Sequence, residues 1–250
     1  MIAWERYMRE AERAASSTIR RRLAALSSLY KYLVVRHGHA AKNPVGEVER
    51  PAINRDEGSM LAFAKAQARK LLDFPAENTI AGLCDRAILS VGLQVGLRRA
   101  EIAALTVGDL HQNRGYDSLR VKGGRRDALA INPQAAARLR AYLEASGHAA
   151  DIDGPLFRPL KHNGKRQDER RCMDPDAIDR VVRKYAGALG LERDYSAHSL
   201  RATFITTALE NGAQLEDVQN AAGHRDPSTT KLYDRCGYNP EKAAGFFATY

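Results

Sequence analysis

One stretch decides the fold, together with the residues placed at fixed distances after it: Ala197-His198-Ser199-Leu200-Arg201, then Gly223-His224, then Tyr233 nine residues after His224. Three positions separate His198 from Arg201, so a helix would bring the imidazole and the guanidinium to one face. A second imidazole and a phenol come later, the phenol one short helix further on. We therefore expect helices that carry groups suited to attack a phosphodiester.

The overall charge favours an extended polyanion as partner. The 250 residues include 39 Lys and Arg against 30 Asp and Glu, which gives a net charge of +9. A basic balance is typical of proteins that bind nucleic acid, although charge alone proves little. The hydrophobic share of 44% allows a real core, and the length fits one large domain with a small one.

Three cysteines, Cys84, Cys172 and Cys236, lie far apart and form no Cys-x-x-Cys pair. This spacing argues against a disulfide framework or a structural zinc site and favours a reducing compartment. No apolar run approaches the ~20 residues of a membrane span, and the first residues lack a signal-peptide core. We therefore expect a soluble protein of the cytoplasm.

Apolar residues recur every three or four positions from residue 16 to residue 35, which predicts an amphipathic helix. Three consecutive arginines at 20–22 give this helix a basic side. Residues 44–58 carry proline and charge without periodicity, which is typical of a linker. A domain boundary is expected near residue 55.

Beyond the linker, the periodicity predicts a helical domain with one small β element. Helices are expected over residues 60–73, 78–96, 99–105, 133–145, 175–189, 198–210, 215–222 and from 226 to just before Tyr233. Between the third and fourth helices, two strand-like runs flank a glycine-rich, basic turn at residues 123–127. The expected fold class is mainly α with a small antiparallel β hairpin or sheet (α+β).

Cutting a DNA strand without water requires an oxygen nucleophile, cationic donors around the phosphoryl oxygens and an acid for the departing sugar oxygen. Tyr233 would be the nucleophile. Lys122, in the hairpin, would be the acid, because an ammonium with a pKa of ~10.4 releases a proton more readily than a guanidinium. The cationic donors would be Arg98, Arg201, His198 and His224. No Asp or Glu cluster is placed to hold magnesium, and the motifs require no cofactor.

Glu101 stands three residues after Arg98, within reach on the same helix. We expect its carboxylate to orient a guanidinium or an imidazole of the site.

Taken together, these motifs resemble the tyrosine recombinase family, which includes the phage integrases and the Xer-type and lambda-integrase-like site-specific recombinases. The matching boxes are Gly96-Leu97-Arg98-Arg99-Ala100-Glu101, Val121-Lys122-Gly123-Gly124-Arg125-Arg126, His198-Ser199-Leu200-Arg201, and Gly223-His224 with Tyr233. They follow the family's order across roughly residues 60 to 240. Separate boxes in sequence are more specific than one short pattern.

The resemblance implies a chemistry and a set of roles. In the family, a tyrosine attacks the scissile phosphate, forms a 3′-phosphotyrosyl link and frees a 5′-hydroxyl that attacks the partner duplex, without metal or ATP. The two arginines would clamp the phosphate and the lysine would be the general acid. His198 would assist proton transfer at the tyrosine, and His224 would donate to a phosphoryl oxygen. The implied catalytic residues are Arg98, Lys122, His198, Arg201, His224 and Tyr233.

The resemblance also implies an order of domains. A partial helical core-binding (SAM-like) segment of the DNA clamp would occupy residues 1–43, followed by the linker at 44–58 and the tyrosine-recombinase catalytic domain at 59–239. The tail at 240–250 would dock on a neighbouring protomer. Family members usually carry a complete core-binding domain, whereas fewer than about 60 residues precede the catalytic part here. We therefore expect a shortened half of the clamp, which reflects either a fragment of a longer protein or an unusual clamp. Ala222 replaces a common leucine before Gly-His, which alters packing rather than chemistry.

The implied partners are double-stranded DNA recombination or attachment sites, bound by a homotetramer assembled on two duplexes, with nucleoid association in the cell. Contacts to DNA are expected from basic residues outside the catalytic set: Arg20, Arg21, Arg22, Arg99, Arg125 and Arg126. The run at 20–22 is equally well explained as a solvated helix face.

Two other functions are compatible with the motifs. A type IB topoisomerase shares the chemistry but acts as a monomer and rejoins the same strand, whereas a DNA-binding regulator would keep the fold without cleaving. The small size and the tail favour recombination over relaxation, and the intact catalytic set argues against a regulator. Tyr195, Tyr238 and Tyr250 compete for the role of nucleophile, and the spacing from His224 selects Tyr233.

Overall fold

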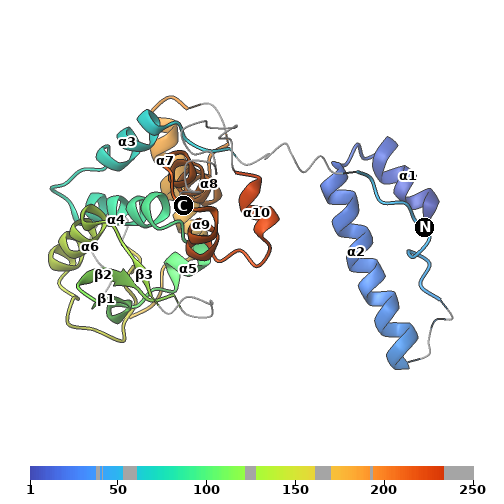
Figure 1. Cartoon of the computed structure of the whole chain (residues 1–250), viewed down its shortest axis with the longest axis horizontal. Helices are drawn as coiled ribbons and strands as arrows, with labels where there is room; N and C mark the ends of the chain where they lie inside the picture. The colour runs from blue at the N-terminus through green and yellow to red at the C-terminus, as the bar shows by residue number, and fades with distance from the viewer. Residues whose placement is uncertain are drawn as a thin grey trace, which may run out of the picture. The chain divides into compact units, whose positions relative to one another are not determined.

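The computed structural model describes residues 1–37, 40, 42–52, 61–121, 128–160, 170–191 and 194–233. The chain forms two compact units that divide between Glu57 and Gly58 (Figure 1). Some predicted features lie outside the described residues: Lys122, Arg125, Arg126, Tyr238, Tyr250 and the tail at 240–250.

The first unit is a small helical body. It contains α1 (Ile2–Glu10), α2 (Ser16–Tyr32) and a π-helical turn (Leu33–His37) that continues α2. Its core is a cluster of buried apolar side chains: Met8, Ile19, Leu23, Val45 and Val48. Two of these, Val45 and Val48, fall in the range expected to be linker. The chain beyond residue 43 therefore still contributes to this core.

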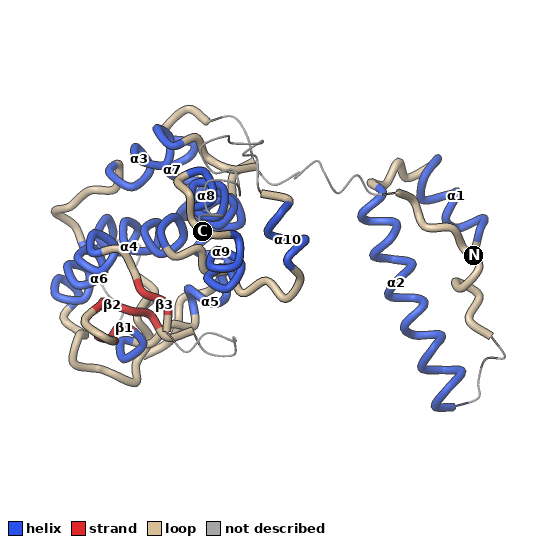
Figure 2. The backbone as a smooth tube through the Cα atoms, in the orientation of Figure 1, coloured by secondary structure: helices blue, strands red, loops and turns tan. Residues whose placement is uncertain are grey.

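The second unit is mainly helical with a small antiparallel sheet (Figure 2). Its helices are α3 (Lys65–Asp73), α4 (Ile80–Gln94), α5 (Arg99–Ala103), α6 (Pro133–Ser146), α7 (Pro175–Ala188), α8 (Ala197–Glu210), α9 (Leu215–Ala222) and α10 (Pro227–Lys231). Its strands are β1 (Leu110–Asn113), β2 (Tyr116–Leu119) and β3 (Leu129–Ala130). The predicted fold class is confirmed. In the described part of the chain, no helix is long and apolar enough to cross a membrane.

The sheet contains one strand more than the predicted hairpin. Strands β2 and β3 form that hairpin, with Leu119 opposite Leu129, and β1 adds antiparallel to the other edge of β2. Arg114 and Gly115 join β1 to β2 with positive φ angles of 49° and 81°. Two such residues are typical of a type I′ turn, which suits a two-residue hairpin. The polar strand Leu110–Asn113 has little apolar alternation, so the sequence pattern did not indicate it.

Helix α3 begins at Lys65 rather than at residue 60, because Phe63, in the segment before it, contacts residues in and next to α8. The backbone N–H of Phe63 donates to Thr203 Oγ1 at 2.8 Å. The Phe63 ring stacks on Tyr195, with centroids 4.0 Å apart and an interplanar angle of 13°. These contacts hold the segment before α3 in a non-helical form against α8.

Helix α4 is the central helix of the second unit, and most of its residues are buried. It packs against both α6 and α8. Two glycines permit the close approach of α8: a Cβ at Gly92 would overlap Leu200, and a Cβ at Gly96 would overlap Phe204. Gly96 also has a φ of +72°, which favours glycine. The end of α4 therefore lies directly against the helix that carries His198 and Arg201.

Candidate active site

Helix α8 begins at Ala197, directly before His198. The backbone N–H of Ala197 donates to Asp179 Oδ1 at 2.8 Å, which satisfies one of the amides that the start of a helix leaves without an acceptor. His198 and Arg201 then lie one turn apart on α8, as the sequence spacing requires. His198 is exposed, whereas Arg201 is only 4% exposed.

Arg201 joins two other parts of the candidate site. Its Nη1 donates to the carbonyl oxygen of Gly96 at 2.6 Å, and its Nη2 donates to the carbonyl oxygen of Ala222. Gly96 precedes Arg98 by two residues, and Ala222 precedes His224 by two. A buried guanidinium is tolerated only when such partners replace its water. Arg201 therefore fixes the positions of two distant segments relative to α8.

Arg98 occupies the N-cap of α5 and is held by Glu101. One Glu101 oxygen accepts the backbone N–H of Arg98 at 2.7 Å, and the other accepts Arg98 Nη1 at 2.9 Å. Arg98 Nη2 also reaches the carbonyl oxygen of Gly223 at 3.4 Å. The Arg98 side chain remains 42% exposed. This geometry orients the guanidinium and leaves part of its surface open to an anion.

His224 follows the end of α9, where Gly223 adopts a left-handed conformation with a φ of 61°. The backbone N–H of His224 bonds to Gln219 O at 3.1 Å, and its Nδ1 lies 2.9 Å from Thr230 Oγ1. Thr230 is fully buried on α10. Gln219 on α9 therefore holds the backbone of His224, and Thr230 on α10 orients its imidazole.

Tyr233 follows α10 and lies beside His224. Their rings are stacked, with centroids 6.2 Å apart and an interplanar angle of 16°. The half-buried Tyr233 ring also packs on the apolar cluster between α8 and α9, which includes Ile205 and Val218. Burial raises the pKa of the Tyr233 phenol, and the positive charge of Arg201 acts in the opposite direction. The phenol is therefore protonated at neutral pH and needs a proton acceptor to react.

His198 is surrounded by positive charge. Its pKa is lowered by partial burial, and further by Arg201, Arg98 and Arg99, whereas Asp179 raises it. An imidazole with a lowered pKa is neutral at physiological pH and can accept a proton.

The competing tyrosine within the described residues is a core residue. Tyr195 is 5% exposed, and its ring lies in the stack with Phe63. It also belongs to the apolar cluster that includes Leu200. Tyr195 is therefore explained by packing, whereas Tyr233 lies beside His224 near Arg201.

The arginines expected to contact DNA have different surroundings. Arg99 pairs with Asp176 at 2.8 Å and also with Asp179. In the first unit, Arg20 Nη1 donates to the carbonyl oxygen of Pro51 at 3.0 Å, Arg22 pairs with Glu12, and Arg21 is exposed. Arg125 and Arg126, like the candidate acid Lys122, are outside the described residues.

Sequence reasoning missed Asp179, which contacts two of the predicted boxes. It lies on α7, 19 residues before His198, in a segment without a motif. The repeated acidic residues at the start of α7 could have marked this end of the helix, because carboxylates favour helix N-termini. They could not have indicated that the carboxylate reaches another helix.

Among the described residues, no group of three or more His, Cys, Asp and Glu side chains could hold a metal ion. The donors gathered at the candidate site are imidazoles, guanidiniums and a phenol, which suit a phosphate better than a cation.

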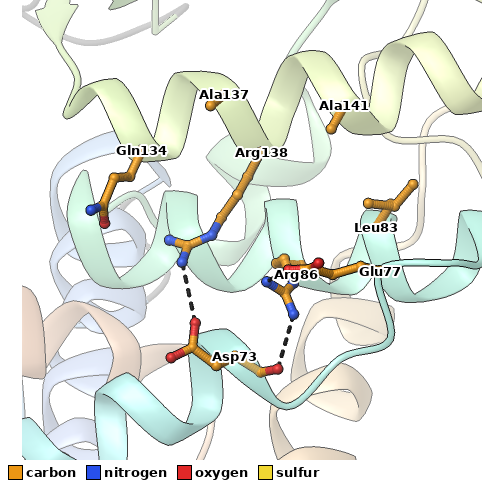
Figure 3. A pocket seen from close by; sticks show the side chains of 8 residues that line it. All are labelled: Asp73, Glu77, Leu83, Arg86, Gln134, Ala137, Arg138 and Ala141. Atoms are coloured by element: carbon orange, nitrogen blue, oxygen red, sulfur yellow. Dashed lines mark hydrogen bonds and ion pairs between the residues drawn. The ribbon is translucent and has the colours of Figure 1, made fainter.

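A separate pocket of about 590 Å³ lies between α3, α4 and α6 (Figure 3). There, Arg86 Nη2 donates to the carbonyl oxygens of Asp73 and Pro75 at 2.9 and 2.8 Å. Arg138 Nη2 lies 3.5 Å from Asp73 Oδ1. The pocket is lined by none of the candidate catalytic residues that the structure describes. These arginines anchor the loop after α3 to the neighbouring helices.

Comparisons with known proteins agree with this architecture. Residues 62–239 match the phage integrase family. Tyrosine recombinase XerC of Pelobacter propionicus is 32% identical over 213 residues, which cover 85% of this chain and 67% of that protein. Tyrosine recombinase XerC of Herpetosiphon aurantiacus is 33% identical over 239 residues, covering 93% and 73%.

Solved structures share the fold. The XerH site-specific recombinase bound to palindromic difH substrate superposes with a TM-score of 0.69 at 18% identity, covering 93% of this chain and 67% of that chain. The Tn1549 transposon integrase in complex with a circular intermediate DNA gives a TM-score of 0.65 at 18% identity, covering 98% and 82%. Together with the XerC relatives, this architecture identifies the class of the protein as a tyrosine recombinase. The chain belongs to the phage integrase family, as the match over residues 62–239 establishes.

Proposed function

We propose that this recombinase cleaves and rejoins double-stranded DNA at specific sites through a covalent bond between Tyr233 and the 3′ phosphate at the cut. The convergence of groups from separate helices carries the proposal. Tyr233 stacks on His224, and Arg201 bonds to the segments that precede His224 and Arg98. Structural roles for the individual residues would not require them to meet.

In the cleavage step, Tyr233 Oη attacks the phosphorus atom while the bond from phosphorus to the 5′ oxygen breaks. The phenol proton passes toward the neutral His198, and Lys122 supplies a proton to the departing 5′ oxygen. A 5′-hydroxyl later attacks the phosphotyrosyl ester, which restores the phosphodiester and frees the phenol. The ester retains the energy of the broken bond, so the cycle uses no ATP. The cationic side chains take the place of a metal ion at the phosphate.

The cationic groups stabilise the charge that develops on the non-bridging oxygens. Arg98 has an exposed guanidinium with its orientation set by Glu101. Arg201 and His224 complete the clamp from α8 and from the turn after α9. Loss of one such donor is expected to slow cleavage by ~10²- to 10³-fold, by analogy with donors to an oxyanion.

A covalent-capture experiment tests this chemistry and also finds the target sequence. A nicked duplex library with a randomised segment is incubated with the protein, denatured, and the DNA that remains attached is sequenced. The wild type is expected to form an adduct on a defined sequence. Tyr233→Phe is expected to lose the adduct and to retain salt-sensitive DNA binding. Tyr195→Phe, which removes a hydroxyl from a core ring, is the matched control. An adduct that persists in Tyr233→Phe rejects the proposed nucleophile.

Strand exchange separates recombination from the two rival functions. Two duplexes that carry the captured sequence and different labels are mixed with the protein. Recombination yields products with both labels, a topoisomerase only relaxes supercoils, and a regulator only shifts the DNA in a gel.

The assembled enzyme is proposed to be a homotetramer on two duplexes, acting on nucleoid DNA in the cytoplasm. Residues 1–43 would form a helical segment of the DNA clamp, and residues 240–250 would dock on a neighbouring protomer. Deletion of residues 240–250 is expected to abolish cooperative assembly on DNA while single-protomer binding persists. Cooperative assembly that survives the deletion would exclude the tail as the link.

A further inference from the structure

One carboxylate joins two of the segments that carry candidate catalytic residues. Asp179 lies on α7, and its Oδ2 pairs with Arg99 Nη1 while its Oδ1 accepts the backbone N–H of Ala197 at 2.8 Å. Arg99 directly follows Arg98, and Ala197 directly precedes His198. The carboxylate therefore spans the gap between the start of α5 and the start of α8.

The Asp179 side chain is well enclosed, with 14% of its surface exposed. A carboxylate that has lost most of its water is retained only where donors and positive charge compensate for the loss. Both of its oxygens have such a donor. The contacts of Asp179 with Arg99 and with Ala197 are therefore part of the folded core of this site and not a solvent-exposed ion pair. We call these two contacts the Asp179 joint.

The position of this joint matters for α8. A helix begins with amides that lack intrahelical acceptors and with a partial positive charge, and a carboxylate satisfies both. His198 is the second residue of α8, so any displacement of the helix start moves its imidazole directly. Arg98, at the N-cap of α5, is similarly close to the other end of the joint.

We propose that Asp179 is a positioning residue of the active site, whose carboxylate fixes the start of α8 against α5 and thereby sets the place of His198 beside Arg98. The catalytic consequence rests on the proposed function. The placement of His198 does not, because it can be measured without DNA.

The charges that face His198 supply an independent readout. Arg201 on α8 and Arg98 and Arg99 on α5 lower the pKa of His198, whereas Asp179 on α7 raises it. Removal of the Asp179 charge is therefore expected to lower the His198 pKa further. A carboxylate too far from His198 to act on it would not produce this shift in a folded variant.

Asp176 provides a matched control on the same helix. It also pairs with Arg99, at 2.8 Å, but its side chain is 65% exposed. Asp176→Asn therefore removes one negative charge beside Arg99 and leaves the bond from Ala197 to Asp179 intact.

The first experiment follows the histidine signals by NMR in protein labelled at histidine, with the His198 signal assigned by its loss in His198→Gln. Asp179→Asn has the shape of aspartate, and its amide oxygen can still accept the N–H of Ala197. We expect the His198 pKa to fall in Asp179→Asn, because the carboxylate that raises it is lost, and to stay near its wild-type value in Asp176→Asn. A thermal melt confirms that each variant is folded.

The second experiment measures single-turnover cleavage of the captured duplex across pH. Asp179→Asn is expected to cleave about 10-fold more slowly at pH 7.5 with a DNA Kd within about 2-fold of wild type, and Asp179→Ala more slowly still, because misplacement of a catalytic group affects the chemical step. Asp176→Asn is expected to cleave like wild type.

The outcomes separate the two proposals. If folded Asp179→Asn matches Asp176→Asn in both the His198 pKa and the cleavage rate, the positioning role is wrong. If wild type forms no Tyr233 adduct but the His198 pKa still shifts only in Asp179→Asn, the proposed function fails while the position of His198 within range of the Asp179 carboxylate stands.

Discussion

The guanidinium of Arg201 donates to the carbonyl oxygen of Gly96 at 2.6 Å, across 105 residues of sequence. The same side chain bonds to Ala222 on the other side. Arg201 is thus a candidate phosphate ligand. Its two hydrogen bonds also hold the end of α4 and the end of α9 together. Its two roles lead to a prediction about stability as well as activity.

Arg201→Ala should destabilise the fold much more than Arg98→Ala. It leaves two buried carbonyl groups without their donor, which costs about 3 kcal/mol of unfolding free energy. Arg98 is partly exposed, so its loss is expected to cost under about 1 kcal/mol. Urea unfolding of the two variants measures the difference. Equal decreases in the free energy of unfolding of the two variants would contradict the structural role of Arg201.

The glycines of α4 should be intolerant of substitution because of the close approach of α8. A methyl group at Gly92 would overlap Leu200, so Gly92→Ala is expected to destabilise the protein by about 1 to 3 kcal/mol. Gly187→Ala, on α7, has no atom within 4 Å of the new Cβ and should stabilise the helix by about 0.5 to 1 kcal/mol. Thermal unfolding of both variants checks the contrast. A neutral Gly92→Ala would mean that α8 can move away from α4.

Thr230 should matter for activity through His224. Its hydroxyl lies 2.9 Å from His224 Nδ1, and the side chain is fully buried. Thr230→Val keeps the volume and removes the contact, so we expect cleavage to slow by about 10-fold. Thr229→Val is the neighbouring control. The measurement is the single-turnover cleavage rate of Thr230→Val and of Thr229→Val. Equal rates in the two variants would show that the Thr230 hydroxyl does not orient the His224 imidazole.

The lowered pKa of His198 predicts a pH dependence of stability. Below pH ~6.5 the unfolded chain takes up a proton at this residue more readily than the folded chain does. The free energy of unfolding should therefore decrease as pH falls through ~6.5 toward the folded pKa, and this contribution should be constant above that range. His198→Gln should remove that part of the slope. Urea unfolding between pH 5.5 and 7.5 provides the measurement, and identical slopes in variant and wild type would refute the lowered pKa.

Much of the helical organisation was predictable because helices leave a local signal. The helix at 215–222 was placed at its observed bounds, and α6, α7 and α8 begin or end within one residue of the predicted ranges. Pro133 and Pro175 at the first turns, and Asn132 and Asp174 as caps, mark these starts in the sequence. Strand β1 was not predicted because its polar residues lack apolar alternation. The late start of α3 was not predicted because it depends on contacts with Thr203 and Tyr195, far along the chain.

The order of the candidate reactive groups could be read from the chain itself, because His-x-x-Arg, Gly-His and the nine-residue interval to Tyr233 are local patterns. The tertiary structure alone decided how these groups meet. Burial of Arg201 between two carbonyl groups, the stack of Tyr233 on His224 and the Asp179 joint all depend on packing between distant helices. Hydrogen bonds and desolvation act between neighbours in space, so only the folded chain could settle these relationships.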